Sequence, residues 1–288
     1  MRDLPEGGHA LAELEKRMDP SARERLRPYA AAGVSLLAAA APGQLRVAFT
    51  SRGGGVSPSP YASLNLGARQ GDDPEHVDRN RARVLRALRA ASGQAPRELV
   101  SPFQEHGQRV CGISEYHRES VRAPCDGLVV NPRIDQGLVA LLLFADCVPV
   151  VLIGEVDGAV VHGGWRGLLG GVVQQGARAM TAPPGTAYIG PSIGPCCYQV
   201  DDELARAFSD RYGPSVVLPR DGGPHLDLWE TATLALAEVE VPRARVVNPR
   251  LCTSCNRDLF YSHRVEGPAT GRHAALLWAA GAAPSRKT

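Results

Sequence analysis

Leu138-Val139-Ala140-Leu141-Leu142-Leu143-Phe144-Ala145-Asp146-Cys147 is the stretch on which both the fold and the chemistry of this chain depend. Its first seven residues form a continuous apolar run of strand length, which is typical of a strand. The run stops at Ala145-Asp146-Cys147. Because side chains at strand ends are held rigidly and face open space, Asp146 and Cys147 are expected in a functional position.

Further elements follow from hydrophobic patterning and turn residues on both sides of this run. Strands are predicted at 45–49, 158–161 and 186–189, and a terminal strand or buried segment at 274–279. Helices are predicted at 73–92, 168–180 and 226–238. Strands and helices alternate without a clean βαβ repeat, so the sequence predicts a mixed α/β or α+β fold.

The first 43 residues differ in texture from the rest of the chain. They are rich in Ala, Glu and Arg, contain one plausible helix near residues 10–27, and end in Ala41-Pro42-Gly43. We therefore expect two parts: an N-terminal extension at 1–43, partly helical or flexible, and a catalytic domain at 44–288.

Composition narrows the class of protein. The 288 residues include 44% hydrophobic and 22% charged residues, which are ordinary values for a soluble globular protein. A formal charge of +2 gives no reason to expect a nucleic-acid or membrane partner. Seven cysteines without a secretory signal favour the cytoplasm, where cysteines more often bind metals, catalyse or lie buried than form disulfides.

Two imidazoles and one thiol stand out as candidate metal ligands. His106 lies in Glu105-His106-Gly107, Cys147 follows the apolar run, and His162 ends the strand predicted at 158–161. Two His and one Cys are the ligand set of a zinc site that keeps one position open, which is the catalytic kind. Each residue also has a simpler interpretation, since a Cys after an apolar run is often a small buried side chain and a lone His is often structural.

Three further polar residues lie beside these ligands in the sequence. Asp146 could orient an imidazole or take a proton, or it could be a turn residue bonded to its own backbone. Arg52 precedes three glycines, and Arg166 follows His162 by four residues. Either guanidinium could bind a phosphate, or could brace a carboxylate of the protein itself.

Cys252-x-x-Cys255 resembles half of a zinc site, and Cys196-Cys197 could complete it. The interval between the two pairs is much longer than in ordinary zinc modules, and adjacent cysteines rarely bind one ion. We therefore expect structural or loop cysteines here. The sequence also lacks a Gly-x-Ser-x-Gly elbow, a phosphate-binding Gly-x-x-x-x-Gly-Lys loop and a dinucleotide fingerprint.

Taken in order, the motifs between Leu45 and Leu277 resemble the YfiH family, also called the laccase-domain or multicopper polyphenol oxidase family. The motifs that carry this resemblance are Thr50-Ser51-Arg52-Gly53-Gly54-Gly55, Pro60-Tyr61-Ala62-Ser63-Leu64-Asn65-Leu66-Gly67, Gly71-Asp72-Asp73-Pro74, Gln104-Glu105-His106-Gly107, Asp126-Gly127-Leu128, Ala145-Asp146-Cys147, His162-Gly163-Gly164-Trp165-Arg166-Gly167, Ile189-Gly190-Pro191-Ser192-Ile193-Gly194-Pro195-Cys196-Cys197-Tyr198, Cys252-Thr253, Phe260-Tyr261-Ser262 and Gly271-Arg272. Departures from the family pattern, such as Glu105 before the histidine, remove no candidate ligand. The resemblance implies a single laccase-domain fold of mixed sheets flanked by helices.

The resemblance also implies a function and a set of site residues. The metal ligands would be His106, Cys147 and His162, holding zinc, with copper as an alternative. Cys147, Asp146 and His162 would be catalytic, and Arg52, Asn65 and Arg166 would contact the substrate. The implied reaction is phosphorolysis of adenosine, inosine and methylthioadenosine, with adenosine deamination as a further activity. The implied partners are a purine nucleoside and phosphate, for a monomer or small homo-oligomer.

Other functions are compatible with the same residues. A blue-copper site also takes two His and one Cys, so a copper-dependent polyphenol oxidase is an alternative, although the chain has no His-x-His pair. A Cys–His hydrolase or deamidase would use Cys147 as nucleophile and His162 or His106 as base. A binding module without activity would leave three reactive side chains at strand ends unexplained.

Overall fold

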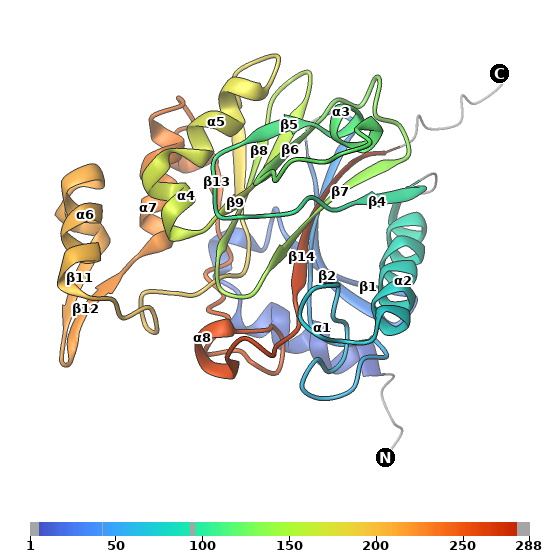
Figure 1. The fold of residues 1–288 in the computed structure, drawn as a ribbon, viewed down its shortest axis with the longest axis horizontal. Coiled ribbons are helices and arrows are strands. Elements are labelled where there is room, and N and C mark those ends of the chain that lie inside the picture. Colours follow the sequence, from blue (N-terminus) through green and yellow to red (C-terminus); the bar gives the residue numbers. More distant parts are fainter. Residues whose placement is uncertain (1–5, 42, 93–95, 281–288) are drawn as a thin grey trace.

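Two six-stranded mixed sheets pack face to face, and helices cover their outer faces (Figure 1). This arrangement comes from a computed structural model of the chain, which describes residues 6–41, 43–92 and 96–280. The mixed α/β fold expected from the sequence is confirmed. Within the described residues, no helix combines the length and the apolarity needed to cross a bilayer.

The first sheet combines the N-terminal and C-terminal strands of the fold. Its order is β1 (Arg27–Ala31), β2 (Val34–Ala40), β3 (Leu45–Thr50), β14 (His273–Ala279), β7 (Leu138–Phe144) and β4 (Glu98–Val100). The second sheet has the order β13 (Val246–Val247), β10 (Thr186–Ile189), β8 (Val148–Ile153), β9 (Gly158–Gly163), β6 (Gly127–Val130) and β5 (Val110–Gly112). A separate hairpin consists of β11 (Val217–Arg220) and β12 (Gly223–Leu226).

Side-chain alternation along β7 shows how the layers form. Ala140, Leu142 and Phe144 point into the core between the two sheets. Val139 and Leu141 point to the opposite face, where they pack under α2. Because successive strand residues face opposite sides, a continuous apolar run fills both cores at once.

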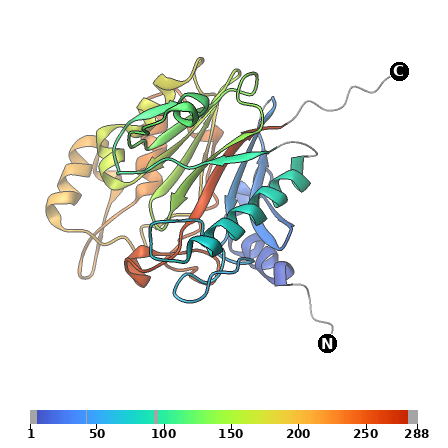
Figure 2. The ribbon, with the colours of Figure 1, turned by 45° about the vertical axis from the view of Figure 1, so that its right-hand side comes forward.

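Helices complete the outer layers of the sandwich. Helix α2 (Pro74–Ser92) lies across the outer face of the first sheet, as Figure 2 shows. Helices α4 (Trp165–Gly170), α5 (Val172–Ala179) and α7 (Leu228–Ala237) cover the second sheet. The remaining helices are α1 (Glu6–Arg17), α3 (Ile113–Arg118), α6 (Asp202–Tyr212) and α8 (His263–Glu266), with short 3-10 turns at Pro20–Ala22, Pro214–Val216 and Arg243–Arg245.

The predicted strands and the helix predicted over 73–92 are confirmed, and local chemistry changes the bounds of the other two predicted helices. The helix expected over 168–180 divides at Gly171, which adopts a left-handed φ of 88° and ends α4. The helix expected from 226 begins at Leu228, because the Asp227 side chain caps it by accepting the N–H groups of Trp229 and Glu230.

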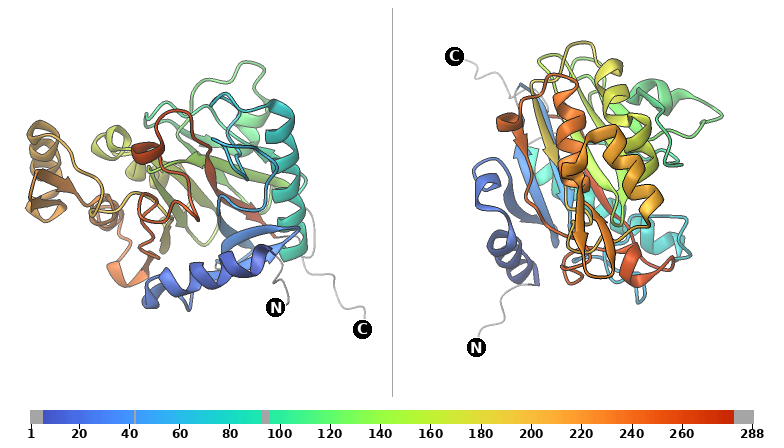
Figure 3. Two further views of the ribbon diagram at one scale, coloured as in Figure 1. Left: turned by 90° about the horizontal axis from the view of Figure 1, so that it is seen from below. Right: turned by 90° about the vertical axis from the view of Figure 1, so that its left-hand side faces the viewer.

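The N-terminal segment is only partly helical. Helix α1 ends at Arg17, and Asp19 is extended (φ −54°, ψ 128°), as expected before Pro20. The predicted helix over 10–27 is therefore too long. The chain then forms the β1–β2 hairpin, with positive φ at Ala32 and Gly33 in its turn. These strands extend the same sheet as β3, and α1 packs on β1 and β2 (Figure 3), so the sheet includes strands from both sides of the expected boundary at residue 43.

The chain passes from the first sheet to the second at two places that matter for function. Residues 101–109 connect β4 to β5, and residues 145–147 connect β7 to β8. The first connection carries His106 and the second carries Cys147. Both crossings meet at one place in the sandwich, next to the end of β9.

Candidate metal centre

His106, Cys147 and His162 come together where the two sheets join. Their potential ligand atoms all lie within 4.8 Å of one another. His162 lies within β9 and is almost fully buried, because the strand continues two residues past the predicted end at Val161. It shares the inner face of the second sheet with Val160, and its ring contacts Phe144 of the first sheet at a centroid distance of 5.3 Å.

Asp126 fixes the orientation of His162. Strands β6 and β9 pair so that Gly127 faces Val161, and one step further the N–H of His162 donates to the Asp126 carbonyl at 2.7 Å. The same register brings the Asp126 carboxylate within 2.9 Å of His162 Nδ1. The hydrogen bond occupies Nδ1 and leaves Nε2 as the ring nitrogen available to Cys147 or to a metal, which is the usual arrangement for a metal-binding histidine.

The same carboxylate also organises the loop that carries His106. The backbone N–H groups of Glu105, His106 and Gly107 donate to Asp126 at 3.2, 3.0 and 2.8 Å. These three bonds curl the loop around the carboxylate, and His106 adopts a left-handed φ of 65°. One buried acid therefore positions both histidines.

Backbone conformation is unusual at both crossings between the sheets. His106 has φ 65° and Asp146 has φ 92°. A non-glycine residue at positive φ costs free energy and persists only where surrounding contacts enforce it, which is typical of functional sites. The residue before Cys147 and a candidate ligand itself are thus both held in strained turns.

Gly164 makes the close approach of the ligands possible. A Cβ atom at this position would lie 2.7 Å from His106 Cδ2 and 3.5 Å from Cys147 Sγ. Any larger residue would push His106 away, so this position requires glycine for steric reasons.

The acid–base properties of the three groups are strongly coupled. Burial by itself would raise the pKa of Cys147, but the charge of His162 and hydrogen bonds to both histidines lower it to about 6. Burial by itself would lower the pKa of His162, but the Cys147 thiolate and Asp126 raise it to about 9. Without a metal, the neutral-pH state is therefore a thiolate paired with an imidazolium.

The donor set and its geometry fit one divalent ion. Zinc bonds of about 2.0–2.3 Å to nitrogen and sulfur place tetrahedral ligands about 3.3–3.8 Å apart, and the three candidate atoms lie within 4.8 Å. The Cys147 thiol already ionises readily, and the Asp126 hydrogen bond presents the correct nitrogen of His162. Three protein ligands leave the fourth position open, as in catalytic zinc sites.

Asp146 is held by the C-terminal segment and does not contact the imidazoles through any hydrogen bond found in the described structure. Its Oδ1 accepts from Thr253 Oγ1 at 2.6 Å, and its Oδ2 accepts from the backbone N–H of Arg264 at 2.6 Å. The carboxylate hydrogen-bonded to His162 is that of Asp126, so the orienting function considered for Asp146 belongs to Asp126 by geometry. A catalytic role for Asp146 stays a prediction.

Arg52 is committed to contacts within the protein. Its guanidinium pairs with Glu266 at 2.7 Å and donates to the carbonyls of Ala62 and Arg257. It also lies over the ring of Tyr261, with Cζ 4.4 Å from the centroid. This is the bracing geometry that the sequence left open as an alternative, and phosphate binding by Arg52 stays a prediction.

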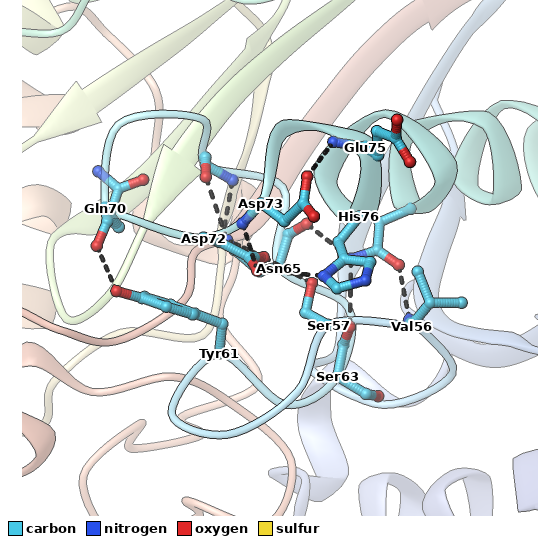
Figure 4. Close-up of polar contacts among 12 residues, drawn as sticks. Val56, Ser57, Tyr61, Ser63, Asn65, Gln70, Asp72, Asp73, Glu75 and His76 are labelled. Atoms are coloured by element: carbon cyan, nitrogen blue, oxygen red, sulfur yellow. Dashed lines mark hydrogen bonds and ion pairs between the residues drawn. The ribbon is translucent and has the colours of Figure 1, made fainter.

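Asn65 is buried in a polar network that shapes the loop between β3 and α2 (Figure 4). Its amide donates to Gly67 and Asp72, and its oxygen accepts from the N–H groups of Gly67 and Arg272. These four bonds use the whole hydrogen-bonding capacity of the side chain. Asn65 thereby joins the loop to the start of β14, and its predicted substrate contact stays a prediction.

Arg166 presents a free charge near the candidate ligands. Its guanidinium lies over the Trp165 ring at 4.3 Å, and no hydrogen bond or ion pair holds it in the described part of the chain. The pKa of Tyr198 is raised to about 12, first by burial and then by the charge of Cys147, while Arg264 and Arg166 oppose the shift. The Tyr198 hydroxyl therefore responds to the charges of Cys147, Arg264 and Arg166.

The second group of cysteines forms a cluster that the sequence did not lead us to expect. The sulfur atoms of Cys196, Cys197, Cys252 and Cys255 all lie within 4.8 Å of one another. The cysteines lie in turns, as expected, but the long interval between the two pairs does not keep them apart. Strands β10 and β13 run parallel side by side, so the segments that follow them leave the sheet at the same edge.

Asp126 and Arg264 are the main residues that sequence reasoning missed. Asp126 directly precedes a buried strand, as Cys147 directly follows one, and that position was an available signal. Nothing in the sequence around Arg264 indicates that its backbone would bind Asp146, because the two residues are 118 positions apart.

The fold and this geometry define a class: an α/β protein with a His–Cys–His group at the junction of two packed sheets. The family described as "Multi-copper polyphenol oxidoreductase laccase" matches residues 46–280, and the chain belongs to this family. The resemblance drawn from the motifs is thereby confirmed. The match begins at residue 46, so α1, β1 and β2 lie outside it.

Relatives and solved structures agree with this assignment. The chain is 35% identical over 247 residues to "Purine nucleoside phosphorylase YlmD" of Geobacillus stearothermophilus, covering 79% of this chain and 88% of the relative. It is 34% identical to "Purine nucleoside phosphorylase YfiH" of Escherichia coli K12, covering 80% of this chain and 91% of the relative. The crystal structure of Geobacillus stearothermophilus YlmD superimposes with a TM-score of 0.73 at 31% identity, covering 85% of this chain and 96% of that one. A Neisseria meningitidis protein gives a TM-score of 0.74 at 33% identity, covering 85% of this chain and 99% of that one.

Proposed function

We propose that this chain is a metal-dependent purine nucleoside phosphorylase acting on adenosine, inosine and methylthioadenosine. The observation that carries the proposal is the His106–Cys147–His162 group, ordered by Asp126, in a chain whose relatives are named purine nucleoside phosphorylases. The substrates are a purine nucleoside and inorganic phosphate, and the metal is zinc.

The proposed reaction exchanges one bond at the sugar for another. A phosphate oxygen forms a bond to the anomeric carbon, and the bond from that carbon to the purine nitrogen breaks. The electron pair of the broken bond leaves with the base, which takes up a proton. The products are the free base and a ribose 1-phosphate, and positive charge develops on the sugar in between.

Residues of the chain supply binding and orientation for this step. Asp126 fixes both histidines, so the metal-binding face is preorganised before substrate arrives. Arg166 has no competing ion pair within the described residues and is proposed to bind phosphate oxygens, for which a guanidinium is well suited. Bound zinc would supply a Lewis acid that stabilises negative charge on an oxygen of the reactants.

The test is to incubate zinc-reconstituted protein with inosine or adenosine, with and without phosphate, and to identify the products by chromatography. We expect free base only when phosphate is present, together with ribose 1-phosphate. The Cys147→Ala variant should lose this activity, whereas Cys111→Ala, which changes a cysteine outside both the His106–Cys147–His162 group and the four-cysteine cluster, should retain it. Free base formed equally without phosphate would contradict phosphorolysis and indicate a hydrolase.

We also propose adenosine deamination as a second activity, and the same experiment distinguishes it from phosphorolysis. Inosine formed from adenosine without phosphate, and lost in Cys147→Ala, would support a deaminase reaction at this site. If inosine never forms, the deaminase part is wrong and the phosphorylase part stands.

A copper oxidase is the second candidate, because the ligand set suits a blue-copper ion and the family carries a laccase description. Phenol oxidation is measured with protein loaded with copper and with protein loaded with zinc. Copper-dependent oxidation lost in Cys147→Ala would favour the oxidase, whereas equal phenol oxidation by buffer copper alone would rule it out. Cytoplasmic location and a monomer or small homo-oligomer stay predictions.

A further inference from the structure

The four-cysteine cluster lies in two segments that are far apart in sequence. Cys196 and Cys197 lie in the turn after β10, and Cys252 and Cys255 lie in the turn after β13. A short parallel bridge joins the segments: Ser192 N donates to the Leu251 carbonyl at 3.2 Å, and Thr253 N donates to the Ser192 carbonyl at 3.1 Å. The backbone thus places both pairs of thiols on one side of a defined junction.

Distances among the sulfur atoms fit four ligands around one ion. Cys255 Sγ lies 3.5 Å from Cys196 Sγ and 3.4 Å from Cys197 Sγ, and all four sulfurs lie within 4.8 Å. Tetrahedral zinc with bonds of about 2.3 Å to sulfur places its ligands about 3.8 Å apart. All the cysteines of the cluster are free thiols in the structure.

The surroundings of Cys252 resemble those of a metal-bound thiolate. Its sulfur is buried and accepts the backbone N–H of Gly194 at 3.2 Å, from the opposite segment. The carbonyl of the same residue accepts from Asn256 through both the backbone N–H and the side-chain amide, which tightens the Cys252–Cys255 turn. Such outer hydrogen bonds fix the direction in which a ligand points.

We propose that Cys196, Cys197, Cys252 and Cys255 bind one structural zinc ion, separate from the His106–Cys147–His162 site. Four thiolates saturate tetrahedral zinc, so this site has no open position for substrate. The long interval between the two pairs is no obstacle, because the pairing of β10 with β13 brings them together.

The ion would fasten the two segments that hold Asp146. The N–H of Ile193 donates to the Asp146 carbonyl at 2.9 Å, and Thr253 Oγ1 donates to its carboxylate at 2.6 Å. Both contacts come from residues within three positions of a proposed ligand. The cluster is thus a structural clamp beside the strained turn that precedes Cys147.

Metal content tests the proposal directly. Reduced full-length protein is saturated with zinc, freed of excess, and measured by elemental analysis. We expect two ions per chain in the natural protein, one in Cys147→Ser, one in Cys255→Ser and none in the double variant. Cys111→Ser is the matched control and should retain two. One ion in the natural protein and none in Cys147→Ser would overturn the proposal.

Cobalt substitution and alkylation keep the proposal testable if Cys255→Ser fails to fold. Cobalt bound to Cys147→Ser should show intense sulfur-to-metal charge-transfer absorption from four thiolates. In the natural protein, zinc should protect the exposed Cys196 and Cys255 from alkylation, and a chelator should restore their reaction. Equal alkylation of both cysteines with and without zinc, or a disulfide within the cluster of the reduced zinc-loaded protein, would overturn it.

Discussion

Asp126 accepts four hydrogen bonds at one buried carboxylate, and through them it determines where two of the three candidate ligands lie. Three bonds come from the backbone of residues 105–107 and one comes from His162 Nδ1. Burial by itself would raise the pKa of Asp126, but the His162 bond and the backbone donors lower it. The residue therefore stays ionised at neutral pH in an environment that water does not reach.

Replacing Asp126 with Asn should weaken metal binding at this site. The amide keeps the shape of the side chain, but its NH₂ group cannot accept from the backbone donors that now face the carboxylate. We expect metal affinity to fall by about 10- to 100-fold and stability to fall by about 1–3 kcal/mol. Zinc titration and denaturant unfolding measure the two effects.

Asp73→Asn is the matched control for this substitution. Asp73 caps the first turn of α2 by accepting the N–H of Glu75 at 2.8 Å, and Asn caps helices equally well. This variant should leave zinc affinity unchanged. If Asp126→Asn binds zinc as tightly as Asp73→Asn does, Asp126 does not organise the ligands.

Cys147 should be unusually reactive once the metal is removed. Its pKa of about 6 means that the thiolate dominates above pH 6 and that its fraction falls as the pH drops below that value. In chelator-treated protein, the rate of Cys147 alkylation should rise with pH through a midpoint near 6, and added zinc should suppress it. Peptide mass spectrometry distinguishes Cys147 from the other cysteines.

His162→Gln supplies the comparison for the alkylation experiment. Loss of the imidazolium removes the charge that lowers the Cys147 pKa, so the midpoint should move upward toward the ordinary thiol value. A midpoint above 8 in the unaltered protein would contradict the thiolate–imidazolium pair.

Sequence reasoning at the residue scale identified groups with unusual chemistry but not their partners. His106, Cys147 and His162 could be selected because each ends an apolar run or adjoins a glycine, and the structure brings them together. Asp146 was selected as the orienting acid because it adjoins Cys147 in sequence, whereas the β6–β9 register places Asp126 against His162.

At the scale of elements, the site depends on two connections that change sheets. The β4–β5 loop and the β7–β8 turn both run from the first sheet to the second, and each contains a non-glycine residue at positive φ. Strand β9 supplies the third ligand from a regular ladder. The space beside the crossings is narrow, because the chain after β9 passes close to His106 and Cys147 at Gly164.

Gly164→Ala should test this steric requirement. The added methyl group would lie 2.7 Å from His106 Cδ2, so His106 must shift and the three ligands must separate. We expect zinc affinity and catalytic activity each to fall by at least about 10-fold, because ligand geometry is critical to a metal site. The far-ultraviolet circular dichroism of the protein should stay the same.

Gly185→Ala is the matched control, because a Cβ at Gly185 meets no atom within 4 Å and its φ is not in the left-handed region. This variant should bind zinc normally. Normal zinc affinity in Gly164→Ala as well would show that the segment after β9 tolerates a larger residue and that the proposed packing around His106 is wrong.

Strands and helices could be predicted from sequence where a single hydrophobic pattern determines them. The strands at 138–144 and 186–189 are found with the predicted bounds, because a short, mainly apolar run is enough to predict where each strand begins and ends. Helix ends depend on single residues such as Gly171, which ends α4, and Asp227, which caps α7. The hydrophobic pattern alone does not locate such residues. The four-cysteine cluster required knowledge of the β10–β13 pairing, which is not encoded near the cysteines.

In the whole molecule, the candidate metal ligands lie at the junction of the two sheets, and the surrounding layers form the hydrophobic cores. The inter-sheet core and the two helix-covered outer cores enclose the strands on both faces, and the two crossings bring His106 and Cys147 to the junction of the sheets. The N-terminal segment adds to this frame: the N–H of Asp19 donates to the Pro249 carbonyl, and Arg17 pairs with Asp258. These contacts link the segment before the family match to the loop that carries Cys252 and Cys255.

Phosphorolysis at the His106–Cys147–His162 site can be followed by phosphorus NMR of a reaction containing zinc-loaded protein, inosine and inorganic phosphate. We expect the phosphate signal to fall as a ribose 1-phosphate signal grows in equal amount. The Cys147→Ala variant, folded by circular dichroism, should leave the phosphate signal unchanged. Conversion of inosine to free base with no new phosphorus signal, or ribose 1-phosphate formed equally by Cys147→Ala, would contradict phosphorolysis at the His106–Cys147–His162 site.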